Sequence, residues 1–282
     1  MHDHIASRTA YRVAIRRAVH QLIDDPKVLD DPFAIAILGE ETAAEIRADP
    51  RSFEKPGTGS LRAFVAARSR FAEDEIAAAV EKGVRQCVVL GAGLDTFAYR
   101  NPSSELRVIE VDHPATQAWK RELLASAGIA IPKTVSFVAV DFAKQTLAEE
   151  MNRAGFRAEE PAFFSWLGVV PYLTREAAFG TLGWIGTLRP GSGVVFDYAI
   201  ARTQLSWLER TALDALSRRV ARAGEPFQLF FEEAELADAL AAMGFRRIDD
   251  LDAARINSRY FANRRDGLRI RGNLGHLIGA GV

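Results

Sequence analysis

The stretch CVVLGAGLDT, residues 87–96, decides the fold of this chain. Residues 87–90 are apolar on both faces, and the turn Gly91-Ala92-Gly93 follows at once. Two glycines around a small residue let the backbone pass close to a ligand, although a simple tight turn would also explain them. A buried strand that ends in such a turn is typical of the first strand of a doubly wound α/β sheet.

Similar apolar runs recur on the C-terminal side of this stretch. Helical patterns fill most of the gaps between them, including residues 114–127 and 175–188. Strands that are apolar on both faces and separated by crossovers predict a parallel sheet covered by helices. The further predicted strands are residues 106–111, 135–140, 162–167, 194–198, 245–251 and 274–282.

The chain divides into two regions by pattern. Residues 7–80 are helical throughout: Asp31-Pro32 begins a short helix that Gly39 ends, and a long helix begins near Leu61. We therefore predict an N-terminal helical lid over residues 1–80. Residues 81–282 form a Rossmann-like domain with a helical insert at about 200–225, after the fifth strand. A helix at 233–243 follows the insert, and Gly244 ends it.

Acidic residues follow the next two strands. Asp112 lies about twenty residues beyond the glycine turn, where a carboxylate can accept both hydroxyls of a ribose. Glu110 shares its face, but Asp112 is nearer the strand tip; the alternative is that Asp112 only caps the following helix. The third strand ends in Asp141 and Phe142, a carboxylate and an aromatic ring that suit an adenine. The sequence thus predicts an adenosine site.

Thr96, three residues beyond the glycine turn, bears on the choice of cofactor. A dinucleotide-binding fingerprint has a third glycine where this chain has Thr96. A nucleoside ligand without phosphates, such as S-adenosylmethionine (SAM), does not need that glycine. We therefore favour SAM, with a nicotinamide-dependent dehydrogenase as the alternative enzyme.

Arg68 lies on the apolar face of the helix that begins near Leu61. A guanidinium on a buried face is costly unless a carboxylate or phosphate meets it. Two partners are open: the carboxylate of an amino-acid-like cofactor, or an acidic side chain of the protein.

Composition excludes several classes of function. The 282 residues hold 36 basic and 37 acidic side chains, so a net charge of −1 favours neither nucleic acid nor an anionic membrane as partner. A single cysteine excludes an internal disulfide framework and a cysteine-clustered zinc site, and we expect no metal. The apolar run 161–173 is too short to span a membrane. We expect a cytoplasmic protein.

Taken together, these motifs resemble the leucine carboxyl methyltransferase family in order and spacing. The resemblance rests on FVAARSRFAEDEI (64–76), VVLGAGLDTFAYR (88–100), RVIEVDHP (107–114), VAVDF (138–142) and FSWLGVVPYLT (164–174). It extends from DDPFAIAILG (30–39) to NSRYFANRRDGLRIRG (257–272). That group includes bacterial SAM-dependent O-methyltransferases similar to TcmP.

The resemblance implies a role for individual residues. It places Arg68 on the methionine carboxylate, Gly91 beside the methionine moiety, Asp112 on the ribose, and Asp141 with Phe142 at the adenine. Many relatives carry a glutamate at the position of Leu167, so the cofactor contact of that acid is in doubt here. Trp166 and Tyr172 are expected near the sulfonium or the substrate, although core packing is the alternative for Trp166.

Histidines bear on the choice of methyl acceptor. A carboxylate is already ionised near neutral pH and needs no base, whereas a phenol would benefit from one. Only His113 is placed by pattern at the pocket rim, and a helix-start role explains it as well. We therefore predict O-methylation of a carboxylate or acidic hydroxyl of a small metabolite. The alternatives are methylation of a protein C-terminal carboxylate and SAM binding without catalysis.

Overall fold

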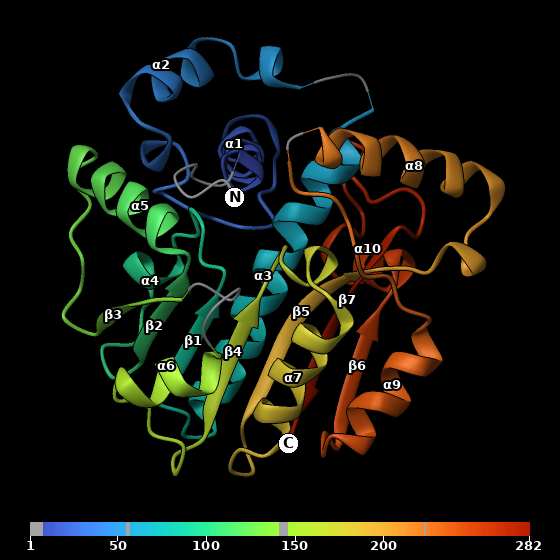
Figure 1. Cartoon of the computed structure of the whole chain (residues 1–282). Helices are drawn as coiled ribbons and strands as arrows, with labels where there is room; N and C mark the ends of the chain where they lie inside the picture. The colour runs from blue at the N-terminus through green and yellow to red at the C-terminus, as the bar shows by residue number, and fades with distance from the viewer. Residues whose placement is uncertain (1–7, 55–56, 141–145, 223) are drawn as a thin grey trace.

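The computed structural model describes residues 8–54, 57–140, 146–222 and 224–282. Within them a single sheet runs through the centre, with helices on both faces (Figure 1). The strand order is β3-β2-β1-β4-β5-β7-β6. The strands are β1 (Gln86–Leu90), β2 (Arg107–Asp112), β3 (Val135–Ala139), β4 (Ala162–Trp166), β5 (Gly193–Ala199), β6 (Arg247–Leu251) and β7 (Gly275–Gly281).

The first five strands confirm the predicted doubly wound arrangement. They all run parallel, and β1 pairs with β2 on one side and with β4 on the other. The chain therefore winds outward from β1 in both directions. In open sheets of this kind, ligands bind beyond the carboxyl ends of the strands at this point of reversal.

The last strand corrects the expectation of a wholly parallel sheet. β7 lies between β5 and β6 and runs antiparallel to both. Its successive residues Leu277 and Ile278 are buried in separate apolar clusters on the two faces of the sheet. A strand that is covered on both faces has the apolar pattern of a parallel strand, because burial and not direction determines that pattern.

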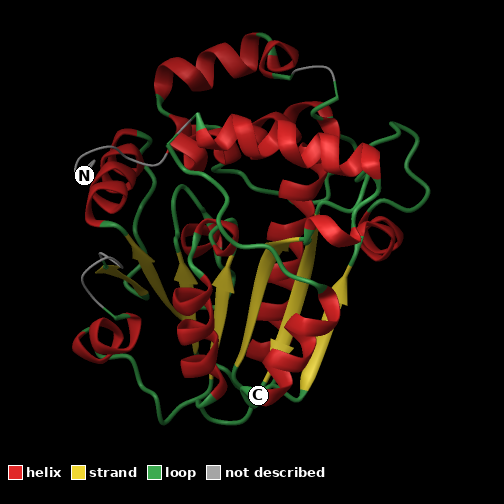
Figure 2. Ribbon diagram, turned by 45° about the vertical axis from the view of Figure 1, so that its right-hand side comes forward, coloured by secondary structure: helices red, strands yellow, loops and turns green. Residues whose placement is uncertain are grey.

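Helices cover both faces of the sheet, as Figures 1 and 2 show. Alternation along β1 sends Cys87 and Val89 into the cluster that includes α3, and Val88 and Leu90 into the cluster that includes α7. The helices are α1 (Arg8–Ile23), α2 (Glu40–Ala48), α3 (Gly59–Glu81), α4 (Phe97–Arg100), α5 (Pro114–Ser126), α6 (Leu147–Arg153), α7 (Arg175–Gly186), α8 (Trp207–Ala221), α9 (Glu233–Ala242) and α10 (Ala253–Tyr260).

Three of these helices, α1, α2 and α8, lie beyond the carboxyl ends of the parallel strands (Figure 1). The insert predicted after the fifth strand contains α8, which Ser206 and Glu209 begin with a reciprocal capping box. The division into a lid over residues 1–80 and a Rossmann-like domain with an insert at about 200–225 stays a prediction. Among the described residues, no helix combines the length and the apolar character that a membrane span requires.

The short helix expected after Asp31 is not an α-helix. Residues 32–35 form a turn, the 3-10 helix η1 (Ala36–Leu38) follows, and Gly39 ends it at φ 85°. The Asp31 side chain accepts a hydrogen bond from the Phe33 amide at 3.1 Å, but its other oxygen accepts one from the Thr96 hydroxyl at 2.6 Å. A contact in the core, rather than a helix cap, therefore fixes the position of Asp31.

Candidate functional site

The glycine turn after β1 has a backbone that tolerates no side chain. Gly91 has φ +63°, and a Cβ atom there would lie closer than 3.0 Å to Cγ2 of Val169. Gly93 has φ +45°, and its Cβ would lie 3.1 Å from that of Ala10 in α1. Since L side chains rarely adopt these angles, both positions require glycine. The turn can therefore come close to a ligand, as the sequence predicted.

Asp112, at the tip of β2, faces this turn. Its Oδ2 accepts a hydrogen bond from the Gly93 amide at 2.5 Å, and its Oδ1 accepts one from the His113 amide at 2.7 Å. Burial raises the pKa of this carboxyl, and the two amide hydrogen bonds only partly oppose the rise. The Ala115 amide instead bonds His113 Nδ1 at 3.3 Å. His113, and not Asp112, therefore caps α5.

Glu110, on the same face of β2 as Asp112, lies inside the protein. It is 1% exposed, forms an ion pair with Lys120 Nζ at 2.8 Å and accepts a hydrogen bond from the Tyr99 hydroxyl at 2.9 Å. Its charge is therefore balanced within the protein, which leaves Asp112 as the carboxylate at the strand tip.

Arg68, in the middle of α3, meets an acidic side chain of the protein. Its Nη1 donates to Asp197 Oδ2 at 3.1 Å, and Asp197 Oδ1 also accepts a hydrogen bond from the Gly168 amide at 2.5 Å. The side chain is buried, yet its Nε has no hydrogen-bond partner among the described residues. A buried donor without a partner is costly, so Arg68 has capacity for a second anionic group. One of the two predicted partners is present, and the other stays a prediction.

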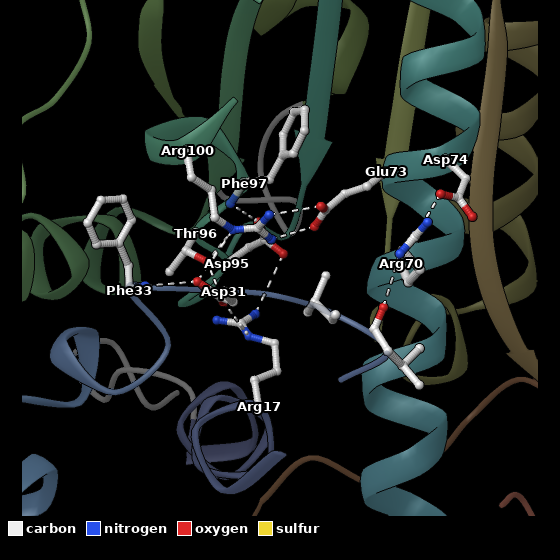
Figure 3. A network of polar contacts seen from close by, with 12 residues as sticks. Arg17, Asp31, Phe33, Arg70, Glu73, Asp74, Asp95, Thr96, Phe97 and Arg100 are labelled. Atoms are coloured by element: carbon white, nitrogen blue, oxygen red, sulfur yellow. Dashed lines mark hydrogen bonds and ion pairs between the residues drawn. The ribbon is translucent and has the colours of Figure 1, made fainter. Parts of the chain in front are cut away.

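A buried polar network holds the glycine turn against the N-terminal helices (Figure 3). Arg17 of α1 donates to the Leu94 carbonyl and lies 3.6 Å from both Asp31 and Asp95. Burial opposes the ionisation of Asp95, but nearby cations, Arg17 foremost, outweigh it and lower its pKa. Thr96, in place of a third glycine, donates to Asp31 at 2.6 Å. Residues 94–96 thus connect the glycine turn to α1 and to the loop that carries Asp31.

The network continues to α3 through Arg100 of α4. Its Nη1 donates to Glu73 at 2.8 Å, and its Nε lies 3.4 Å from Asp31. Sequence reasoning did not identify these contacts, because a polar residue in a helical pattern gives no sign of burial. The sequence did contain one signal for this network: Thr96 occupies the position where a dinucleotide-binding turn has glycine.

A cavity of about 260 Å³ opens between this turn, α1 and the loop after β4. Thr9 and Val13 of α1 and Glu225 from the segment after α8 also line it, and sequence reasoning did not identify them. The structure brings together most of the predicted site residues here. Those that line the cavity are Arg68, Gly91, Ala92, Gly93, Asp112, His113 and Tyr172.

One predicted site residue within the described chain, Trp166, is not among those that line the cavity. Trp166 is buried in the core, where the centroid of its ring lies 6.3 Å from that of Phe196 in an edge-to-face arrangement, which agrees with the core-packing alternative. The reason is strand alternation: Ser165 of β4 lines the cavity, and Trp166 points to the opposite face. Asp141 and Phe142 lie outside the described residues.

Comparison with known proteins decides the family. The profile for leucine carboxyl methyltransferases matches residues 10–186. The chain belongs to the leucine carboxyl methyltransferase family. Over 95% of both chains it is 32% identical to YktD of Bacillus subtilis (strain 168), which bears the name of a SAM-dependent methyltransferase. A protein of the same description from Saccharopolyspora erythraea is 34% identical, over 70% of this chain and 69% of its own.

Solved structures show the same fold. A Thermobifida fusca protein titled as a methyltransferase covers 95% of this methyltransferase and 93% of its own chain, with a TM-score of 0.59 and 17% identity. A DUF574 family protein from Streptomyces avermitilis covers 98% and 97%, with a TM-score of 0.55 and 18% identity. The chain is thus a SAM-dependent methyltransferase with the class I fold, and SAM is its cofactor.

The residues of the cavity fit this cofactor. The orphaned Nε of Arg68 matches a ligand carboxylate, and the carboxylate of Asp112 matches the ribose hydroxyls. The turn at Gly91 leaves its backbone exposed to the cavity because no Cβ fits there. Each of these features matches one part of SAM.

Proposed function

We propose that this methyltransferase methylates an oxygen of a carboxylate or an acidic hydroxyl on a small metabolite. The observation that carries the proposal is the state of the two titratable groups expected near the reaction. Burial raises the pKa of the Tyr172 phenol to about 12, and His113 Nδ1 accepts the capping hydrogen bond of α5. The protonated Tyr172 phenol is not poised to act as a base, and the Nδ1 lone pair of His113 is already engaged in a hydrogen bond. An acceptor that is already ionised needs no such base.

The cavity residues then have distinct tasks. Arg68 binds the methionine carboxylate, Asp112 the ribose, and the Gly91 turn lies beside the methionine moiety. Asp141 and Phe142 are proposed for the adenine. SAM supplies an electrophilic methyl group when bound. The contribution of the protein to an in-line displacement is to orient both reactants so that the nucleophile, carbon and sulfur are collinear.

The covering helices support a small acceptor. Thr9 and Val13 of α1 stand over the glycine turn, and the segment that follows α8 forms another wall. These walls exclude water and limit the size of what can enter. We expect neither nucleic acid nor a membrane as a partner, and we place the reaction in the cytoplasm.

The decisive experiment is incubation with SAM that carries a deuterated methyl group. Mass spectrometry of acidic metabolites should reveal a product heavier by one labelled methyl group. Base hydrolysis should remove that group if the acceptor is a carboxylate and leave it in place if the acceptor is a hydroxyl. Label that appears only on protein C-termini would identify the alternative acceptor. Cofactor binding without any labelled product would favour a non-catalytic SAM-binding protein.

A further inference from the structure

Charged side chains in the cavity differ in how far the protein itself satisfies them. Arg17 and Asp95 lie 3.6 Å apart as an ion pair, and Asp112 accepts two amide hydrogen bonds. Arg68 has a partner for Nη1 and none for Nε among the described residues. Glu225 lines the same cavity, and no described residue pairs with its carboxylate. Arg68 keeps its ion pair with Asp197, so its Nε and the carboxylate of Glu225 are the groups that remain available to a ligand. The Nε of Arg17 also lacks a hydrogen-bond partner among the described residues, but this guanidinium already faces Asp31 and Asp95.

Glu225 is held at the cavity by the segment that carries it. The Gln228 amide donates to the Pro171 carbonyl at 2.8 Å, and the Gln228 side chain donates to the Tyr172 carbonyl at 2.7 Å. The Phe227 ring lies 5.1 Å from that of Tyr172. These contacts fasten residues 227 and 228 to η3 (Val170–Tyr172), which lies directly beyond the loop after β4. The Glu225 amide itself donates to the Val220 carbonyl at 3.2 Å, so Glu225 is anchored at the cavity on both sides.

Arg68, Tyr172 and Glu225 line the same cavity. Both charges act on the Tyr172 phenol: burial is the main cause of its raised pKa, Arg68 opposes the rise and Glu225 adds to it. Opposite charges that line one cavity and both act on this partly buried ring suit a zwitterionic ligand.

SAM brings a zwitterion, because its methionine end carries both a carboxylate and an ammonium group. Burial of an ammonium group is costly unless an acceptor meets it. On the loop after β4, Leu167 lines the cavity with an apolar side chain that can accept no hydrogen bond. Backbone carbonyls can accept part of its hydrogen bonds, but only a carboxylate from another element can also balance its charge.

We propose that Glu225 binds the ammonium group of SAM, opposite Arg68, which binds the carboxylate. This inference rests on the proposed role of Arg68 in the cofactor site. Glu225 is then a cofactor-binding residue supplied by the segment after α8. The segment that helps to cover the cavity thereby also takes part in cofactor binding.

Calorimetry with two ligands tests the assignment. One ligand is S-adenosylhomocysteine, and the other is its analogue in which hydrogen replaces the amino group. Glu225→Gln should lower the affinity for S-adenosylhomocysteine by about tenfold or more, as expected for the loss of a hydrogen bond between charged groups. The same substitution should change the affinity for the analogue by less than about threefold, because the analogue has no ammonium group that Glu225 could bind. Glu176→Gln, on the exposed first turn of α7, is the matched control and should change neither affinity.

A rescue variant distinguishes binding from a structural role. Leu167→Glu, added to Glu225→Gln, places a carboxylate on the facing wall and should restore the preference for the aminated ligand. Equal losses for both ligands, no loss for either, or a lower kcat with unchanged affinity would each overturn the assignment. The methyl-transfer product of the wild-type enzyme tests the proposed function separately. A wild type that binds no S-adenosylhomocysteine would overturn the cofactor site together with this inference.

Discussion

Gly91→Ala should destabilise the protein through one contact that the structure identifies. The new Cβ would lie closer than 3.0 Å to Cγ2 of Val169, at a φ of +63° that L residues rarely adopt. The left-handed backbone costs about 1 to 2 kcal/mol, and overpacking about 1 to 3 kcal/mol. We therefore expect the free energy of unfolding to fall by about 2 to 5 kcal/mol. Urea denaturation followed by tryptophan fluorescence measures this change.

Two further variants test the cause of this loss. Val169→Ala removes Cγ2, so Gly91→Ala should cost about 1 to 3 kcal/mol less in that background. Gly183→Ala lies within α7, where an added Cβ meets nothing, and should stabilise the protein by up to about 1 kcal/mol. If Gly91→Ala lowers the free energy of unfolding equally in the wild type and in Val169→Ala, the steric argument is refuted. A decrease below about 0.5 kcal/mol would refute the backbone argument as well.

Other predictions concern the cofactor site and its support. Asp112→Ala should abolish detectable SAM binding in calorimetry while the circular dichroism spectrum stays unchanged; unaltered affinity would remove the ribose assignment. Arg68→Ala should lower the affinity for SAM much more than the affinity for decarboxylated SAM, and equal losses of affinity would mean that this arginine does not contact the carboxylate. Thr96→Val leaves Asp31 without its buried donor and should lower the free energy of unfolding by about 1 to 3 kcal/mol in urea denaturation; a neutral effect would contradict the network. Because the pKa of Tyr172 is raised to about 12, its phenol stays protonated below pH 10, and Tyr172→Phe should leave the shape of the pH profile of kcat/KM unchanged. A basic limb that disappears in this variant would assign a proton-transfer role to the phenol.

The sequence predicted the strands well because burial on both faces leaves a continuous apolar run. β1 (Gln86–Leu90) and β4 (Ala162–Trp166) lie within a residue of the predicted bounds. Strand direction does not affect such a run, so the antiparallel β7 could not be distinguished. Asp31 shows a second limit: an aspartate before a proline matches a helix start, whereas the structure uses it as a buried acceptor for Thr96.

The candidate site was predictable where chemistry follows a strand. Asp112 and the Gly91 turn lie at consecutive strand ends, which the topology brings to one edge of the sheet. Glu225 has no such signal, because it lies on a covering segment that only the tertiary structure brings to the cavity. Arg17 is similar: it stands beside Arg16 in the sequence, yet Arg17 is buried and Arg16 is partly exposed.

The hydrogen bond between Thr96 and Asp31 joins two stretches that lie 65 positions apart in the chain. Replacement of Thr96 alone leaves a buried oxygen of Asp31 without its hydroxyl donor, and replacement of Asp31 also removes the carboxylate that Arg17 and Arg100 face. In the evolution of this scaffold, we therefore expect a change at Asp31 to be accompanied by changes at Thr96 and at both arginines.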